Sequence, residues 1–369
     1  MKLRYKVLNG LLVFLASAIV VLAFALAHNT PCEPASAVDG DRPLMKAIDY
    51  QCYGSADVLN YLDRNRPSPK DDEVLVKIES ASVNPADWHY MRGTPYLVRF
   101  LTGMGKPTDS RFGVDFSGTV QAVGAKVTNF QAGDEVFGAA SGAFAEYVTV
   151  RANRSVVKKP ANVSFPEAAG VPIAALTALQ AVRDKGGLKA GQKVLINGAS
   201  GGVGTYAVQI AKAMGAEVTG VCSGRNIEMV KSIGADHVIN YKKEDYTQGG
   251  QRFDLIVDMV GNHGLLANRK VMKPNATLVL VGGKKGNWIA PLINLAKAPL
   301  LSLLLDQQFT SFVAKLNKQD LEHMAGLMAA GKVRTVIDRQ YPLSEVAEAI
   351  RYSESGRARG KIIIAAGGS

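Results

Sequence analysis

The stretch VLINGASGGVGTYAVQIAKAMGAEVTGVCSGRN, residues 194–226, decides the fold. Its first apolar run, ending at GA, predicts a buried strand. The run TYAVQIAKAMG predicts a helix that has one apolar face and ends at Gly215. EVTGVCS predicts a second strand. A strand, a helix and a strand in this order predict a βαβ unit with parallel strands.

The turn between the first strand and the helix has the glycine pattern of a dinucleotide-binding loop. Ala199, Gly201 and Gly204 occupy the three positions of the GxGxxG/A pattern, with Ala in the first place. The first position needs a very small residue for a tight turn, the second lets the backbone approach a pyrophosphate, and the third lets the helix pack closely on the strand. The free N–H groups and the partial positive charge of the helix N-terminus favour phosphate. The predicted cofactor-binding loop comprises Ala199, Ser200, Gly201, Gly202, Val203 and Gly204.

The residues after the second strand indicate which dinucleotide binds. NAD-binding sites usually place Asp or Glu here to hold the ribose hydroxyls, but this chain has Ser223-Gly224-Arg225-Asn226. An arginine can grip a 2′-phosphate and a serine hydroxyl can donate to it. We therefore predict NADP(H), with Ser223 and Arg225 as contacts and Tyr241 lining the same pocket. The alternatives are a surface role for Arg225 and an edge-strand role for Tyr241.

The rest of the chain divides by its periodicity. From about residue 165, apolar strands alternate with helical segments, which predicts a doubly wound α/β sheet. Residues 45–150 instead look β-rich, because stretches such as EVLVKIE (73–79) alternate apolar and polar residues.

Composition limits the function. The net charge is +11, but the basic residues are dispersed over 369 positions, so nucleic-acid binding is not expected. Cys32, Cys52 and Cys222 are far apart and form no CxxC pair, so neither a disulfide framework nor a thiolate zinc cluster is predicted. The five histidines show no close ligand spacing, and no metal site is expected.

The N-terminus differs from the rest of the chain. Three basic residues, Lys2, Arg4 and Lys6, precede an uncharged run at 8–27. As a helix this run would be ~30 Å long, the thickness of a bilayer's hydrocarbon core. We expect a single-pass membrane anchor here, followed by a linker up to residue 44. A cleaved signal, or a cytoplasmic protein that begins at Met45, is the alternative.

Several motifs in order resemble the medium-chain dehydrogenase/reductase superfamily, in its zinc-free quinone oxidoreductase branch. They are MKAIDYQCYG, VNPADWHYMRG, GVDFSGTVQAVG, FQAGDEVFG, AGVPIAALTALQAV, GASGGVG, GADHVINY and GRARGKIII. Zinc-dependent relatives would show Cys near position 84 and Gly-His-Glu near position 113, whereas this chain has Asn84 and Gly113-Val114-Asp115. The resemblance therefore implies an enzyme that does not use zinc.

The resemblance also implies a domain plan and a homodimer. Residues 1–44 would be the anchor or signal segment and linker. Residues 45–165, completed by 336–369, would form a GroES-like domain, and 166–335 a Rossmann domain inserted between them. The active site would lie in the cleft between the two domains.

The remaining site residues come from the resemblance. Asn84 is the leading candidate beside the nicotinamide, where it would bond the ribose or the substrate carbonyl. Tyr96 matches in position the tyrosine that donates a proton in enoyl reductases, with His89 and Tyr90 as rivals. The further cofactor contacts implied are Thr177, Val260, Gly261, Val281, Gly282 and Lys361.

These features together predict an NADPH-dependent oxidoreductase that transfers a hydride to a quinone or an α,β-unsaturated carbonyl. The small-molecule substrate itself is not identified by the sequence. One alternative is an NADP-dependent alcohol or aldehyde dehydrogenase. The other is a non-catalytic NADPH-binding module, as zeta-crystallin-like relatives suggest.

Overall fold

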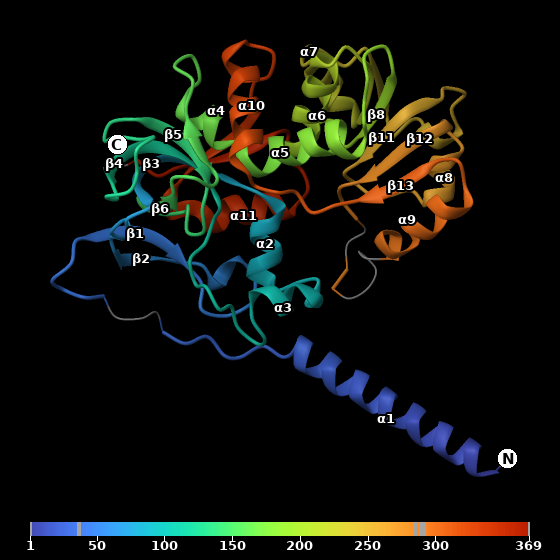
Figure 1. Cartoon of the computed structure of the whole chain (residues 1–369), viewed down its shortest axis with the longest axis horizontal. Helices are drawn as coiled ribbons and strands as arrows, with labels where there is room; N and C mark the ends of the chain where they lie inside the picture. The colour runs from blue at the N-terminus through green and yellow to red at the C-terminus, as the bar shows by residue number, and fades with distance from the viewer. Residues whose placement is uncertain (1, 35–37, 284–285, 288–292, 368–369) are drawn as a thin grey trace.

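The computed structural model describes residues 2–34, 38–283, 286–287 and 293–367. Two sheets with their covering helices lie next to each other, and a long N-terminal helix leads away from them (Figure 1). The backbone passes from the β-rich part into the parallel sheet after α4 (Phe165–Ala169), and returns to the β-rich part at its end.

The Rossmann-like sheet confirms the prediction made from the glycine-rich stretch. Its six strands lie in the order β10-β9-β8-β11-β12-β13, and every neighbouring pair is parallel. The order reverses between β8 and β11, and ligands bind at such a switch point in open α/β sheets. The strands are β8 (Lys193–Asn197), β9 (Glu217–Cys222), β10 (His237–Asn240), β11 (Phe253–Asp258), β12 (Met272–Leu280) and β13 (Gln308–Ser311).

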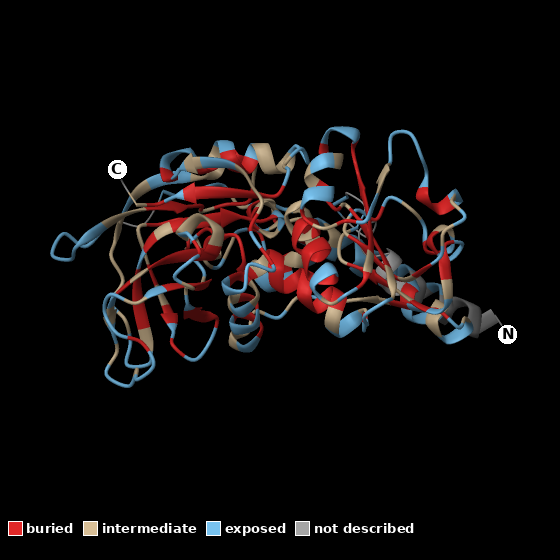
Figure 2. Cartoon of the chain, turned by 90° about the horizontal axis from the view of Figure 1, so that it is seen from above, coloured by how far each residue is buried: buried red, intermediate tan, exposed pale blue. Residues whose placement is uncertain are grey.

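Helices cover this sheet, and two of them lie toward the other half of the chain. Helix α5 (Pro172–Leu179) begins at a proline, as its sequence predicts, and continues as the π-helical stretch η3 (Gln180–Lys185). The other helices are α6 (Gly202–Ala213), α7 (Ile227–Ser232), α8 (Leu265–Arg269), α9 (Ile293–Leu304) and α10 (Lys318–Ala329), with short 3₁₀ turns at η4 (Gly224–Asn226) and η5 (Tyr246–Gln248). Helices α5 and α6 are largely buried in the middle of the molecule, and buried strands lie on both sides of them (Figure 2).

The GroES-like part is built on a second sheet in the order β14-β15-β3-β4-β5-β7, in which β6 also pairs with β3. Its last strand lies antiparallel to β3, with Ile362 opposite Val83, so Lys361 comes next to Asn84. The strands are β3 (Glu73–Val83), β4 (Asp115–Val123), β5 (Glu135–Ala139), β6 (Tyr147–Arg151), β7 (Val156–Lys158), β14 (Ile337–Pro342) and β15 (Lys361–Ala365).

Smaller elements surround this sheet. Strands β1 (Leu44–Asp49) and β2 (Asn60–Asn65) form a separate antiparallel pair. The helical segments are η1 (Ala56–Val58), α2 (Pro85–Arg92), η2 (Tyr96–Val98), α3 (Arg99–Thr102), η7 (Leu343–Glu345) and α11 (Val346–Glu354). The apolar core beneath them includes the fully buried Phe116, Phe144 and Ile78.

Helix α1 (Lys2–Ala27) projects from the lower part of the molecule, with its N-terminus at the far end (Figure 1). Phe14, Ile19 and Phe24 are exposed on it, whereas Leu26 in its last turn is buried. Within the residues that the structure describes, no helix is both long and apolar enough to cross a membrane. The membrane span predicted at residues 8–27 is therefore not supported.

The prediction that the cysteines form no disulfide is wrong. Cys32 and Cys52 are bonded, with their Cα atoms 4.9 Å apart. The chain after α1 turns back along the GroES-like part, and this long-range contact brings together two cysteines whose spacing forms no recognised motif. Cys222 is buried and free.

Candidate active site

The phosphate-binding loop connects β8 to α6 and leaves the helix N-terminus open. Gly198 adopts a left-handed conformation with φ +88°. The sharp turn therefore lies at Gly198, one residue earlier than the sequence pattern predicts, which places it at Ala199. A Cβ on Gly204 would overlap the carbonyl oxygen of Gly198 and lie 2.9 Å from the Cα of Ala199. Gly201 is the N-cap residue of the helix and, as a glycine, has no side chain of its own to cap it; a Cβ there would lie 3.5 Å from its nearest neighbour. The backbone N–H groups that follow Gly201 therefore suit an anion.

A buried carboxylate holds the ends of the neighbouring strands beside this loop. Asp258 Oδ1 accepts hydrogen bonds from the backbone N–H of Val260 at 3.0 Å and of Gly261 at 2.9 Å. It also accepts from Asn197 Nδ2 at 2.8 Å. The carbonyl oxygen of Asp258 accepts from the N–H of Val281 at 2.9 Å. Val260, Gly261, Val281 and Gly282 thus lie together, and the sequence analysis missed the residue that organises them.

The end of β9 carries the residues predicted to select the cofactor. Ser223 is largely buried, Tyr241 is exposed, and Arg225 donates through Nη2 to the carbonyl of Arg357 at 3.1 Å. Asn226, which the sequence analysis did not select, donates from Nδ2 to Ser200 Oγ at 2.9 Å. Its buried Oδ1 has no hydrogen-bond partner among the described residues, so it can accept from a ligand. Asn226 links the phosphate-binding loop to the predicted 2′-phosphate side.

Asn84 lies in a buried polar cluster between β3, β4 and β15. Its Oδ1 accepts from Lys361 Nζ at 2.6 Å, and its Nδ2 donates to Asp115 Oδ2 at 2.8 Å. Its backbone N–H donates to Asp87 Oδ2 at 2.7 Å. Only 1% of Asn84 is exposed. The amide is therefore occupied on both sides by neighbouring side chains.

The charged members of this cluster influence one another. Lys361 Nζ lies 3.7 Å from Asp115 Oδ2, and both side chains are buried. Burial raises the pKa of Asp115, and Lys361 and Asn84 oppose that rise. Burial lowers the pKa of Lys361, and Asp115 and Asp87 oppose that fall. In the sequence, Asp115 is only a departure from the zinc motif and Asp87 carries no signal, because the burial and the partners of both carboxylates are set by the tertiary structure.

Lys361 joins this cluster to the phosphate-binding loop. Gly360, just before it, forms an isolated parallel bridge with Gly201. A Cβ on Gly202 would lie 3.3 Å from Lys361 Cδ. Thr177 is on α5, where its hydroxyl donates to the carbonyl of Ile173, and the N–H of Ile173 donates to Asp115 Oδ1 at 3.2 Å. The structure thus brings Asn84, Thr177, Lys361 and the loop to one junction.

The three predicted proton donors, His89, Tyr90 and Tyr96, lie on the segment after Asn84, and Tyr90 is exposed. His89 Nδ1 is 2.7 Å from the carbonyl of Thr94, its ring stacks on Trp88, and burial lowers its pKa. The Tyr96 ring packs against the Arg99 guanidinium, 4.8 Å away. The backbone N–H of Tyr96 donates to the carbonyl of Asn287 at 2.8 Å. Asn287 follows β12, so Tyr96 is placed where the two halves of the chain meet.

The polar cluster makes stability depend on pH through Asp87. Burial raises the pKa of this carboxyl from 3.8 to about 7. The folded state then holds the proton more tightly than the unfolded state, so this group's contribution to stability falls as pH rises from about 4 to about 7. Between pH 5 and 7.5 we expect the native chain to lose about 2–3 kcal/mol that Asp87→Asn does not lose. Urea unfolding at both pH values measures this, with the exposed Asp41→Asn as control; equal pH dependence in all three proteins would contradict it.

Comparison with known proteins identifies the family. Residues 70–161 match the family model of the alcohol dehydrogenase GroES-like domain, and residues 233–364 match that of the zinc-binding dehydrogenases. The chloroplast envelope quinone oxidoreductase homolog of Arabidopsis thaliana is 37% identical over 340 residues, which cover 87% of this chain and 98% of that protein. The chain belongs to the zinc-free quinone oxidoreductase branch of the medium-chain dehydrogenase/reductase superfamily.

Other members of the superfamily agree with this assignment. The 2-methylene-furan-3-one reductase of Solanum lycopersicum is 34% identical, with 87% of this chain and 79% of that protein covered. The structure of the quinone oxidoreductase from Coxiella burnetii superposes with a TM-score of 0.77 at 30% identity, covering 88% of this chain and 99% of that one. Among the described residues, no group of three His, Cys, Asp or Glu side chains could hold a metal ion.

Proposed function

We propose that this chain is an NADPH-dependent oxidoreductase that transfers a hydride to a quinone or an α,β-unsaturated carbonyl without a metal. The observation that carries this proposal is the open phosphate-binding loop, next to which residues 223–226 contain no Asp or Glu. The relatives of this chain include proteins named as a quinone oxidoreductase homolog and a 2-methylene-furan-3-one reductase. The loop fits the cofactor because Gly201 leaves the helix N-terminus open. In addition, the buried Asn226 Oδ1 accepts no hydrogen bond from the described residues and can accept one from the cofactor.

The residues present have distinct roles in this proposal. The N–H groups after Gly201 hold the pyrophosphate, and Ser223 and Arg225 hold the 2′-phosphate. NADPH supplies the hydride when it is bound. Thr177 and the strand ends 260–261 and 281–282 orient the nicotinamide side. Negative charge that develops on the acceptor oxygen needs a nearby donor, and Tyr96 is the residue we assign to it.

Two roles change from those expected from the sequence. Asn84 bonds Lys361 and Asp115 with its amide, so we assign it to positioning the junction rather than to the substrate. His89 Nδ1 is engaged by its own turn, and because its pKa is lowered the ring is mostly neutral at pH 7, so we assign the proton donation to Tyr96 instead.

A steady-state assay tests the activity. The purified full chain is mixed with NADPH or NADH and with quinones, enones and aldehydes, and absorbance of the reduced nicotinamide is followed. We expect fast NADPH oxidation with quinones or enones. Turnover with aldehydes only would favour an alcohol or aldehyde dehydrogenase, and NADPH binding without turnover would favour the binding-module alternative.

Arg225 provides a test of cofactor choice. Arg225→Gln removes a charge-assisted hydrogen bond to the 2′-phosphate, which is worth about 1.5–3 kcal/mol, so we expect KM for NADPH to rise ~10- to 100-fold. KM for NADH should stay the same, because NADH lacks that phosphate. Arg252→Ala, an exposed arginine away from the loop, is the matched control. Equal effects on both cofactors would refute the assignment.

Membrane attachment through residues 8–27 and a homodimer are separate proposals. The first rests on the uncharged sequence of this run and on the exposed Phe14, Ile19 and Phe24, although no helix among the described residues is long and apolar enough to span a membrane. Carbonate extraction of cell membranes that contain the full chain tests it: an anchored chain stays in the pellet, and a cytoplasmic chain is found in the supernatant. Light scattering of the detergent-free fraction distinguishes a dimer from a monomer.

A further inference from the structure

The Cys32–Cys52 disulfide lies outside the parts of the chain that match the family models, which begin at residue 70. It joins two segments of different kinds. Cys32 lies on residues 26–34, which comprise the last two residues of helix α1 and the chain that follows it and which we call the arm. Cys52 lies in the loop between β1 and η1, directly before Tyr53.

The arm is fastened to the segment that carries Tyr96. The Arg99 guanidinium donates through Nη1 to the carbonyls of Leu26 at 2.7 Å and His28 at 2.8 Å. The N–H of Thr30 donates to the carbonyl of Gly105 at 2.9 Å. Each of these contacts ties the arm to residues 93–106, which we call the donor segment.

The same arginine organises the donor segment. Arg99 Nε donates to the carbonyl of Gly93 at 2.8 Å, and its guanidinium lies against the rings of Tyr53, at 4.5 Å, and Tyr96. The Tyr53 hydroxyl donates to the carbonyl of Gly103 at 2.8 Å. The disulfide therefore joins the arm covalently to Cys52. The next residue, Tyr53, contacts the donor segment, which carries the proposed proton donor.

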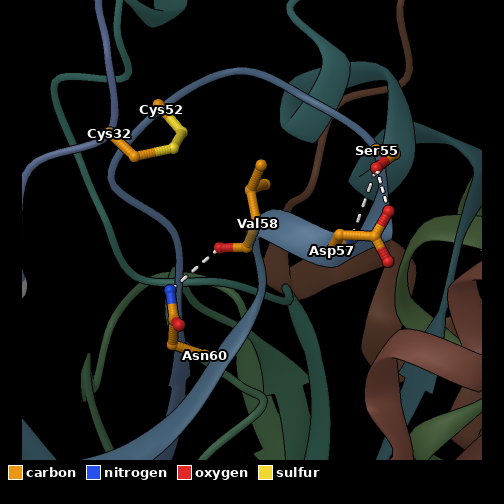
Figure 3. The surroundings of a disulfide bond; sticks show 6 residues. All are labelled: Cys32, Cys52, Ser55, Asp57, Val58 and Asn60. Carbon is orange, nitrogen blue, oxygen red and sulfur yellow. Dashed lines mark hydrogen bonds between the residues drawn. A yellow bond between two sulfur atoms is a disulfide. The ribbon is translucent and has the colours of Figure 1, made fainter.

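The disulfide is accessible from one side. Figure 3 shows the bond between Cys32 and Cys52. Cys52 is buried, whereas Cys32 is exposed and borders a groove of about 580 Å³. The residues that line this groove include Cys32 and Glu33 of the arm and Gln51 and Asp57 of the connection between β1 and β2. A small reductant can thus reach the sulfur of Cys32. The free Cys222 does not take part in this thiol exchange, because it is buried and burial raises its pKa to about 11.

We propose that Cys32–Cys52 is a reversible dithiol/disulfide site that controls how firmly the arm holds the donor segment. A dithiol reductant attacks Cys32 as a thiolate, forms a mixed disulfide with it and releases Cys52 as a thiol after protonation. The second thiol of the reductant then frees Cys32. The chain gains two electrons and two protons, and the reductant becomes a disulfide.

Reduction leaves the arm with noncovalent contacts only. Among the described residues, these contacts include the Arg99 and Thr30 hydrogen bonds and the exposed ion pair of Lys106 with Glu33, at 2.9 Å. The arm then separates more often, and the donor segment loses part of its order. Because binding must now order that segment, we expect the KM of the acceptor to rise roughly threefold to tenfold, with Kd for NADPH unchanged. This kinetic consequence rests on the proposed reductase function.

The test compares the oxidised full chain with the same protein treated with dithiothreitol under native conditions. Alkylation followed by mass spectrometry should label Cys32 and Cys52 only after treatment, and reoxidation should restore protection. Hydrogen exchange should increase in the arm and in the donor segment. Neither readout needs turnover, so they decide the proposal even if the chain proves not to be a reductase.

Cys32→Ser is the matched variant, because the replaced side chain is exposed. It should behave as the reduced protein with and without dithiothreitol. Arg99→Lys should loosen the arm in the presence of the disulfide. The proposal is overturned if dithiothreitol does not reduce the folded chain, or if reduction leaves hydrogen exchange of residues 93–106 unchanged.

Discussion

Replacing Gly201 by Ala is expected to leave the fold intact and to weaken NADPH binding at least ~30-fold, or about 2 kcal/mol. Gly201 has φ −85° and its added Cβ would have its nearest neighbour at 3.5 Å, so the substitution meets no obstacle within the chain. The methyl group would instead occupy the face on which the backbone approaches the pyrophosphate.

Gly204→Ala is the matched partner, and its main expected effect is on the stability of the fold. Its Cβ would overlap the carbonyl of Gly198, so the helix must move away from the loop. We expect a loss of about 2–4 kcal/mol in the free energy of unfolding. Urea unfolding and NADPH titration by fluorescence measure the two effects. Wild-type NADPH affinity in a folded Gly201→Ala variant would show that the loop does not bind phosphate.

Lys361→Met is expected to destabilise the chain by about 3–5 kcal/mol, because it leaves Asp115 buried without its cation. It also removes the partner of Asn84 Oδ1 at the junction with the phosphate-binding loop, so turnover should fall together with stability. The double variant Lys361→Met/Asp115→Asn removes both charges and should recover most of the lost stability.

An exposed pair provides the control for this experiment. Lys126 lies 3.0 Å from Asp71, and both side chains are mostly exposed. Lys126→Met should change the free energy of unfolding by less than ~1 kcal/mol. If the Lys361 and Asp115 substitutions prove additive in a double-mutant cycle, the two charges do not interact and the assigned cluster is incorrect.

The local sequence was sufficient for the Rossmann-like part of the fold. Residues 194–226 contain a strand, a turn, a helix and a second strand, and each is specified by neighbours within a few positions. Residues 223–226 directly follow the second strand of this segment, so the sequence alone also shows that they contain no Asp or Glu. The turn was misplaced by one residue, since only the structure shows that Gly198 has the positive φ.

The polar cluster depended on contacts that no local pattern contains. Lys361 reaches Asn84 only because β15 pairs with β3 across most of the chain's length. The sequence therefore predicts that Asn84 bonds the nicotinamide ribose or the substrate carbonyl, whereas its amide is bonded to Lys361 and Asp115. Asp87 and Asp258 were not selected, because an acidic residue becomes informative only when its burial and its partners are known.

The sequence by itself determined the alternation of strands and helices, the glycine-rich loop and, through the motifs, the family. These features are local, because hydrophobic periodicity and glycine conformations act over a few residues. Tertiary structure alone decided that Cys32 meets Cys52, that Arg99 joins the arm to the donor segment, and that Lys361 lies beside Asn84 and Asp115. Such contacts arise when distant segments pack together, and sequence spacing carries no record of the distance between them.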